Sequence, residues 1–202
     1  MIHGISSGPI TFFPLKTYLK NCGYQKLHCI SYPVDTLSFN DSLDHVNKEI
    51  EKIIPSKKQE IILIGQSFGG NISNNLHKFG WNIQNAIYIC SPLNGARIIN
   101  NVGYYIPGIV SNLINKKAFD YLKDKEKEDK PPHKFHTISF GWFGGTFDGC
   151  VYEDEAKLSE ENHTHISWTD HRTGFIDHRL FDIVNNILEL DDENIIIEYI
   201  DE

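Results

Sequence analysis

The sequence has few cysteines, few basic residues and no long apolar run. Its four cysteines are Cys22, Cys29, Cys90 and Cys150, and they form neither a CxxC pair nor a zinc-ligand spacing. A disulfide scaffold is therefore not expected, and free thiols fit a reducing compartment. No apolar run approaches the roughly 20 residues that span a bilayer, so we expect no stable membrane insertion.

Positive charge is also scarce, because Lys and Arg number 19 against 27 Asp and Glu, for a formal net charge of −8. Nucleic-acid binding needs a surplus of Lys and Arg that neutralises phosphates, so a nucleic-acid partner is not expected. The chain opens with Met1-Ile2-His3-Gly4, which leaves no room for the charged and apolar segments of a signal peptide. The expectation is a cytoplasmic protein.

A length of 202 residues predicts a single domain, residues 1–202. Hydrophobic periodicity predicts helices over 10–22, 40–54 and 177–190, and one from Ser67 to about Lys78. Ser42 is the expected cap of the second. Short β-type runs predict strands at 26–31, 61–64, 83–89, 135–140 and 163–168, and 194–200 fits a last edge strand. This alternation is typical of an α/β fold with a doubly wound, mostly parallel sheet flanked by helices.

Residues 96–134 interrupt the alternation with a segment too long for an ordinary loop. It contains an amphipathic stretch, 109–122, and a charge run, 123–130. Two interpretations stay open. The segment is either a surface helix pair with a solvated charged tip, or a lid or cap over an active site.

The strongest local signal is a G-x-S-x-G motif, Gly65-Gln66-Ser67-Phe68-Gly69, which follows the apolar run 61–64 and precedes a predicted helix. A serine on such a strand–turn–helix projects its hydroxyl from the sheet edge, and the glycines let neighbouring backbone approach the turn. The alternative is a glycine-rich turn that binds a phosphate or a dinucleotide. G-x-G-x-x-G and the P-loop lysine are both absent, which argues against it.

Three segments together resemble the small bacterial-type lipases and esterases of the α/β-hydrolase superfamily. His3-Gly4-Ile5-Ser6-Ser7 is similar to their oxyanion loop, Gly65–Gly70 to their nucleophile elbow, and Cys90–Gly95 to the turn after their next strand. The resemblance implies a minimal α/β-hydrolase fold and acyl-ester chemistry without a cofactor. One feature departs from the family, because Met1-Ile2 stands where a full apolar strand normally precedes the His-Gly loop.

The remaining triad members should follow Ser67 in the order acid, then histidine. Asp148 is the expected acid because Asp148-Gly149-Cys150-Val151 resembles the family's acid loop, and Asp154 is the competitor within a charged run. Among the histidines that follow, His171 lies beyond a strand end in a segment similar to the family's His turn. His163 and His165 fall within a predicted strand, whose side chains point across the sheet.

These assignments define the expected roles. His171 serves as general base and acid for Ser67, and Asp148 orients the imidazole. The backbone N–H groups of Ile5 and Phe68 are the expected oxyanion hole, with His3 as a structural hydrogen-bonding residue. A metal site built from His163, His165, Asp170 and His171 is the rival hypothesis, which lacks HExxH spacing, so no metal is expected.

The leading hypothesis is a serine hydrolase that cleaves carboxylic esters through an acyl-enzyme intermediate. A non-catalytic relative that binds or scaffolds is the alternative from another class, and acyl thioesterase, amidase and peroxidase chemistry remain open. The expected partner is a small-molecule acyl ester or a lipid, and the oligomeric state stays undetermined. Four aromatic side chains either line an acyl pocket or belong to the core: Phe12, Phe13, Phe143 and Phe147.

Overall fold

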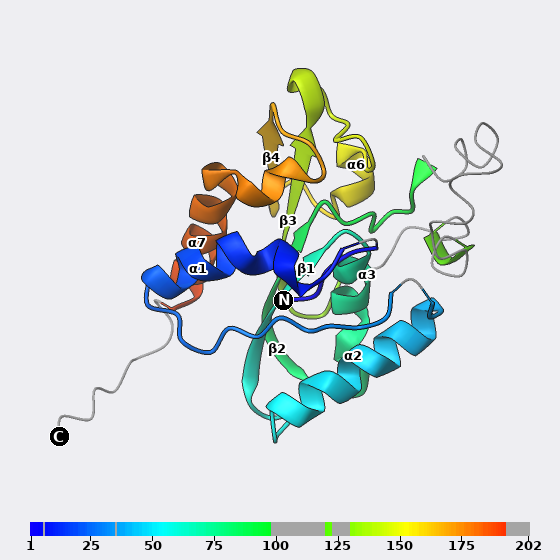
Figure 1. The fold of residues 1–202 in the computed structure, drawn as a ribbon, viewed down its shortest axis with the longest axis vertical. Coiled ribbons are helices and arrows are strands. Elements are labelled where there is room, and N and C mark those ends of the chain that lie inside the picture. Colours follow the sequence, from blue (N-terminus) through cyan, green and yellow to red (C-terminus); the bar gives the residue numbers. More distant parts are fainter. Residues whose placement is uncertain (6, 35, 98–119, 123–129, 193–202) are drawn as a thin grey trace.

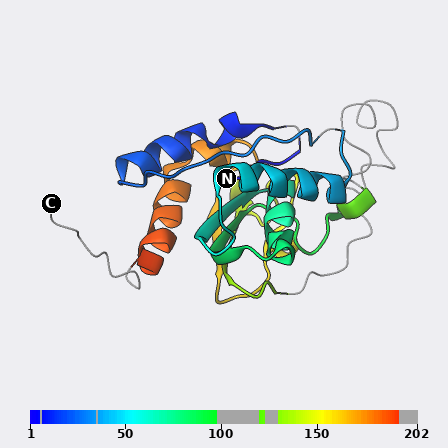
Figure 2. The same ribbon diagram turned by 90° about the horizontal axis from the view of Figure 1, so that it is seen from below.

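The computed structural model describes residues 1–5, 7–34, 36–97, 120–122 and 130–192. Four parallel strands form its sheet in the order β1-β2-β3-β4. They are β1 (Glu60–Gln66), β2 (Asn82–Ile89), β3 (Lys134–Gly141) and β4 (His163–Ser167). Helices cover both faces of this sheet (Figures 1 and 2), as the alternation of the sequence predicts.

Two helices lie on one face, α1 (Phe13–Asn21) and α7 (His178–Asp192), and their apolar residues share a core cluster with Ile64, Ile87 and Ile138. The other face carries α2 (Phe39–Ile53), α3 (Phe68–Asn75) and the short α6 (Glu153–Ala156). Single-turn 3-10 helices complete the chain, at Pro9–Phe12, Leu76–Phe79, Trp142–Gly144 and Thr173–Ile176.

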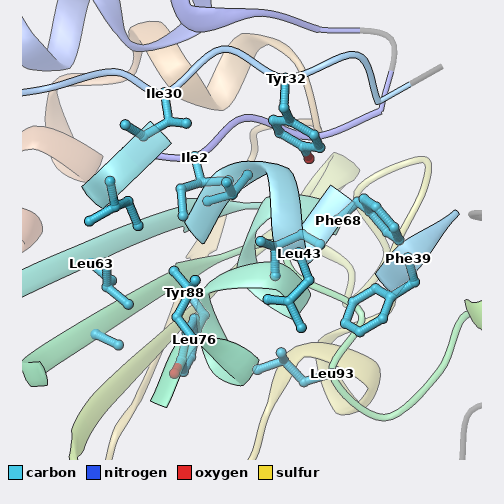
Figure 3. Packing of buried hydrophobic residues seen from close by; sticks show 14 of the residues in the cluster. Ile2, Ile30, Tyr32, Phe39, Leu43, Leu63, Phe68, Leu76, Tyr88 and Leu93 are labelled. Carbon is cyan, nitrogen blue, oxygen red and sulfur yellow. The ribbon is translucent and has the colours of Figure 1, made fainter. Parts of the chain in front are cut away.

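The core on the α2 and α3 side fills the space between these helices and the sheet (Figure 3). Leu63 and Tyr88 point into it from β1 and β2, whereas Ile64 and Ile87 point to the opposite cluster. This alternation is the period of two that a strand imposes on its side chains. Apolar residues on both faces make the sheet a central layer, as the continuous apolar run at 61–64 indicates.

The direction in which successive chain segments are added to the sheet changes at Ile2. This residue forms parallel bridges to both Ile30 and Gly65, so the segment around Ile2 lies between residue 30 and β1. Its N–H donates to the Ile64 carbonyl (2.8 Å) and its carbonyl accepts from Gln66 (2.9 Å). The loop after Ile2 and the turn after β1 therefore face each other at a topological switch point, where ligands bind in open α/β sheets.

Most predicted elements are confirmed within a few residues, with two corrections. The strand expected at 26–31 is reduced to one bridged residue, Ile30, because only Met1 and Ile2 lie beside it. Ser38 rather than Ser42 caps α2, accepting a hydrogen bond from the Asp41 N–H (3.2 Å). The run 194–200 and most of 96–134 lie outside the described residues. Among the described helices, none combines the length and hydropathy of a membrane span.

The two serines at the start of α2 give a stability test. Replacing Ser38 with Ala removes the capping acceptor and should lower the free energy of unfolding by about 1 kcal/mol. Ser42 is the matched control, because its hydroxyl is buried without a hydrogen-bond partner and Ser42→Ala should not destabilise the fold. Urea unfolding followed by circular dichroism measures both variants. Equal losses would show that the cap is not at Ser38.

Candidate active site

Ser67 lies on a strained turn between β1 and α3. Its backbone has φ of 50° and ψ of −125°, a conformation that residues with a side chain rarely adopt. Its N–H donates to the Ile89 carbonyl at the end of β2 (2.8 Å), and its carbonyl accepts from Gly70 (2.9 Å). Strain of about 1–3 kcal/mol persists only where the surroundings fix the backbone, and such sites cluster at functional centres. The half-buried Ser67 is held in this way.

Glycines surround this turn because backbone approaches it from several directions. A Cβ on Gly69 would lie 2.2 Å from the Ile2 carbonyl oxygen, and one on Gly65 would lie 2.6 Å from Gly70 Cα. A Cβ on Gly4 would lie 2.8 Å from the Ser67 Cβ. The first two match the expectation for the motif. The third places the His3-Gly4 loop directly against Ser67.

Two side chains that the sequence analysis does not identify hold this loop. The Oε1 of Gln66 accepts from the Gly4 N–H (3.2 Å) and from the Ser7 hydroxyl (3.2 Å). The Tyr32 hydroxyl donates to the His3 carbonyl (2.7 Å), and the Tyr32 ring stacks on the His3 imidazole at 4.6 Å. A polar Gln66 at the end of an apolar strand is the one signal of this arrangement in the sequence.

The two residues expected to form an oxyanion hole are both close to Ser67 along the chain or in space. Ile5 directly follows the Gly4 that abuts Ser67, and Phe68 is the first residue of α3. The first N–H groups of a helix have no intrahelical acceptor, and the helix dipole is positive there. His3 is buried, with its Nδ1 3.0 Å from the Gly4 carbonyl, which is a structural position.

Asp148 and His171 form a direct pair. The Oδ2 of Asp148 lies 2.7 Å from the His171 Nδ1, and the Asp148 carbonyl accepts from the His171 N–H (2.9 Å). The Oδ1 accepts from the N–H groups of Cys150 (2.8 Å) and Val151 (2.7 Å). Asp148 is 1% exposed, so these donors replace the water that a carboxylate needs. With Nδ1–H donating to the carboxylate, the His171 Nε2 is left as the acceptor nitrogen.

The competing acid and histidines are engaged elsewhere. Asp154 pairs with Arg97 on the surface of α6, and its side chain is 68% exposed. His163 contacts the hydroxyls of Thr137 (2.8 Å) and Ser139 (3.0 Å) across β3. His165 contacts Ser139 and the Gly145 carbonyl, as expected for side chains that point sideways from a strand.

The three expected triad residues share one edge of the sheet. Ser67 follows β1, Asp148 lies in the loop after β3, and His171 lies in the loop after β4. All four strands are parallel, so these loops meet at the carboxyl edge. Asp148 and His171 are hydrogen-bonded to each other, and Ser67 is held at the end of β2, where the Ile89 carbonyl accepts its N–H.

The four aromatic side chains considered for an acyl pocket do not gather at one place. Phe12 is fully buried in the core beneath α1, whereas Phe13 and Phe143 are exposed. Phe147 stacks on Tyr152 at 4.4 Å. The core interpretation therefore holds for Phe12 alone.

Among the described residues, one group of metal-ligand types has its donor atoms within 4.8 Å of one another: Cys90, Asp148 and His171. Burial raises the pKa of the Cys90 thiol well above its usual range, which disfavours the thiolate that a metal requires. Asp170, part of the rival metal hypothesis, accepts instead from Arg172 and Thr173 in its own turn. These donor sets do not resemble a prepared metal site.

Comparisons with solved structures identify the fold. The mature lipase BlEst2 of Bacillus licheniformis superposes with a TM-score of 0.72 at 16% identity, covering 93% of this chain and 89% of that one. An esterase from Thermogutta terrifontis gives 0.60 at 12% identity, covering 94% and 88%. Phospholipase PlaB from Legionella pneumophila gives 0.62 at 14% identity, covering 77% of this chain and 44% of PlaB. This chain has the α/β-hydrolase fold.

Neither the family models nor the curated proteins searched match the sequence.

The buried His163 predicts how stability depends on pH. Burial outweighs the neighbouring Glu153 carboxylate and lowers the pKa of His163 from 6.5 to about 4. Between these values the unfolded chain binds a proton that the folded chain does not, so the free energy of unfolding should fall as pH falls from 6.5 to 4. His163→Gln should flatten this slope, with the exposed His28→Gln as control. Urea unfolding at several pH values measures this dependence. If the free energy of unfolding of His163→Gln falls with pH as steeply as that of the wild type, His163 is not its source.

Proposed function

We propose that this protein is a serine hydrolase that cleaves carboxylic esters, with Ser67 as nucleophile, His171 as general base and acid, and Asp148 as the acid that orients the imidazole. The observation that carries the proposal is the hydrogen bond between the buried Asp148 and the half-buried His171, at the same sheet edge as the strained Ser67 turn. The lipase, esterase and phospholipase with the same fold support ester chemistry.

The reaction proceeds in two halves. The His171 Nε2 takes the Ser67 proton as Oγ bonds to the acyl carbon, and the carbonyl π electrons move to its oxygen. The tetrahedral intermediate collapses, the alcohol leaves with the proton from His171, and an acyl-Ser67 ester remains. His171 then takes a proton from water, whose oxygen attacks the acyl carbon. The acid is released as Ser67 recovers its proton.

The backbone N–H groups of Ile5 and Phe68 are the donors proposed for the oxyanion. Their arrangement requires that the His3-Gly4 loop and the start of α3 keep a fixed separation, because such donors act through preorganisation. Gln66 and Tyr32 support this by hydrogen-bonding the two polar groups of the His3–Gly4 peptide, Gln66 at the Gly4 N–H and Tyr32 at the His3 carbonyl. Gln66, which directly precedes Ser67, therefore also fixes the His3-Gly4 loop.

Substrate selection is assigned to residues 96–134. Tyr121, within their described part, stacks on Phe39 at 3.6 Å and meets Phe68 edge-on at 6.2 Å. Phe68 directly follows the nucleophile, so Tyr121 lies on the side of the proposed site that Phe68 occupies. We propose that the segment 96–134 forms one wall of an acyl pocket for a small ester or lipid.

The triad is tested by three variants with matched controls. Ser67→Ala, His171→Ala and Asp148→Asn should each lower the hydrolysis of p-nitrophenyl esters by about 10⁴-fold, because triad members act as a unit. Ser67→Ala should also lose labelling by a fluorophosphonate probe. His163→Gln and Asp154→Asn are the controls and should stay near wild type.

Retained turnover in Ser67→Ala would disprove the assignment of Ser67 as the nucleophile of the triad. If the folded wild-type protein hydrolyses neither esters nor thioesters and is not labelled by the probe, it is instead a non-catalytic relative. Preferential turnover of acyl thioesters would change the substrate class and leave the triad in place.

The acyl wall is tested by Tyr121→Ala. Removing this ring opens space beside Phe68 and should shift relative kcat/KM toward longer or bulkier acyl esters by about tenfold. Tyr18→Ala, on the opposite face of the sheet, is the control and should leave the chain-length optimum unchanged. An unchanged optimum in Tyr121→Ala, with only its melting temperature lowered, would show that the segment packs on the flank without touching substrate.

A further inference from the structure

Cys90 occupies the strand end between the proposed nucleophile and the acid loop. It is the first residue after β2, is fully buried, and has a left-handed φ of 48°, close to the 50° of Ser67. Its N–H donates to the Ile138 carbonyl on β3 (2.7 Å), and the preceding Ile89 accepts the Ser67 N–H (2.8 Å). The position is thus fixed from both neighbouring strands.

The Cys90 side chain lies against the Asp148–His171 pair. Its sulfur, a carboxylate oxygen of Asp148 and an imidazole nitrogen of His171 all lie within 4.8 Å of one another. The remaining polar contacts of the carboxylate are the N–H groups of Cys150 and Val151 on Oδ1 and the imidazole on Oδ2. A thiol at this place faces a buried negative charge.

The thiol is protonated there. Burial, reinforced by the Asp148 carboxylate, raises the pKa of Cys90 well above its usual range, so the group is a neutral S–H at physiological pH. An S–H is a weak hydrogen-bond donor, and an ionised carboxylate is a strong acceptor. The orientation in which the S–H points at Asp148 is therefore favoured. Its reactivity as a nucleophile is correspondingly low.

We propose that Cys90 is a positioning residue for the reaction, whose thiol donates to the Asp148 carboxylate and so tunes how strongly that carboxylate holds the His171 imidazolium. The inference rests on the proposed function for its catalytic consequence. Without this donor, more negative charge resides on the Oδ2 that faces His171, and the imidazolium is held more tightly. Less His171 is then in the basic form that Ser67 requires at neutral pH.

The fold limits which substitutions test this. A β-branched replacement is strained at a φ of 48°, so Cys90→Ala and Cys90→Ser form the useful pair. Both lose the sulfur volume, and they differ only in a hydroxyl that retains a donor. Cys90→Gly suits the left-handed backbone and is a second variant without a donor. Cys29→Ala is the control, because the Cys29 sulfur lies 3.9 Å from the sulfur of Met1 and outside the Asp148–His171 pair.

The experiment follows the His171 imidazole by NMR as pH is varied, alongside the pH profile of kcat/KM. In Cys90→Ala and Cys90→Gly the imidazole titration and the acid limb of the profile should both move up by about 0.5 pH unit. Cys90→Ser and Cys29→Ala should stay within about 0.2 unit of wild type. A purely structural role would lower the melting temperature and leave the titration in place.

Two results overturn the proposal. One is a wild-type titration in both Cys90→Ala and Cys90→Gly. The other is an equal displacement in Cys90→Ser and Cys90→Ala, which would assign the effect to lost volume rather than to the donor. The NMR titration needs no turnover, so it decides the contact even if Ser67→Ala disproves the proposed hydrolysis.

Discussion

The pairing of Ile2 between Ile30 and Gly65 is the constraint on which the candidate site depends. It fixes the chain immediately before the His3-Gly4 loop to the strand immediately before Ser67. The Ile2 carbonyl accepts from Gln66 and lies so close to Gly69 that no side chain fits there. Loop and turn are therefore parts of one hydrogen-bonded unit.

The carboxyl edge of the sheet is also where backbone strain concentrates. Among the described residues, those other than glycine with positive φ are Ser67, Cys90, Phe143 and Trp168. Each stands within two residues of the end of a different strand, from β1 to β4 in order. Left-handed backbone after every strand turns the chain sharply, and such strain is stored at functional sites. The distribution therefore supports the placement of the proposed site at the carboxyl edge rather than at the amino edge.

Sequence patterns predict most of the fold because its strongest signals are local. The apolar run at 61–64 and the period of the last helix read directly as a buried strand and an amphipathic helix. The strand at 26–31 is overestimated because strand length depends on the partner, and Met1-Ile2 offers little to pair with. Ser42 is mistaken for a cap because the choice between two nearby serines depends on where the helix begins.

The candidate site divides in the same way. The Asp148–His171 contact follows from motif order and strand ends, which are visible in the sequence. The support from Gln66 and Tyr32 is not visible, because their hydrogen bonds join residues 62 and 29 positions apart. The placement of Cys90 beside Asp148 likewise depends on how β2 and β3 align, which a single strand pattern does not contain.

The charge of Asp148 explains why the site is built around backbone. Among the described residues, no Arg or Lys forms an ion pair with this carboxylate, which is compensated by two N–H groups and an imidazole. A fixed cation would hold the carboxylate in place but would also repel the imidazolium that the proposed reaction forms. Neutral donors hold it without that repulsion, so the negative charge stays directed at His171. The tight loop from Asp148 to Val151 supplies two of these donors, and the neutral Cys90 thiol proposed as a further donor directly follows β2.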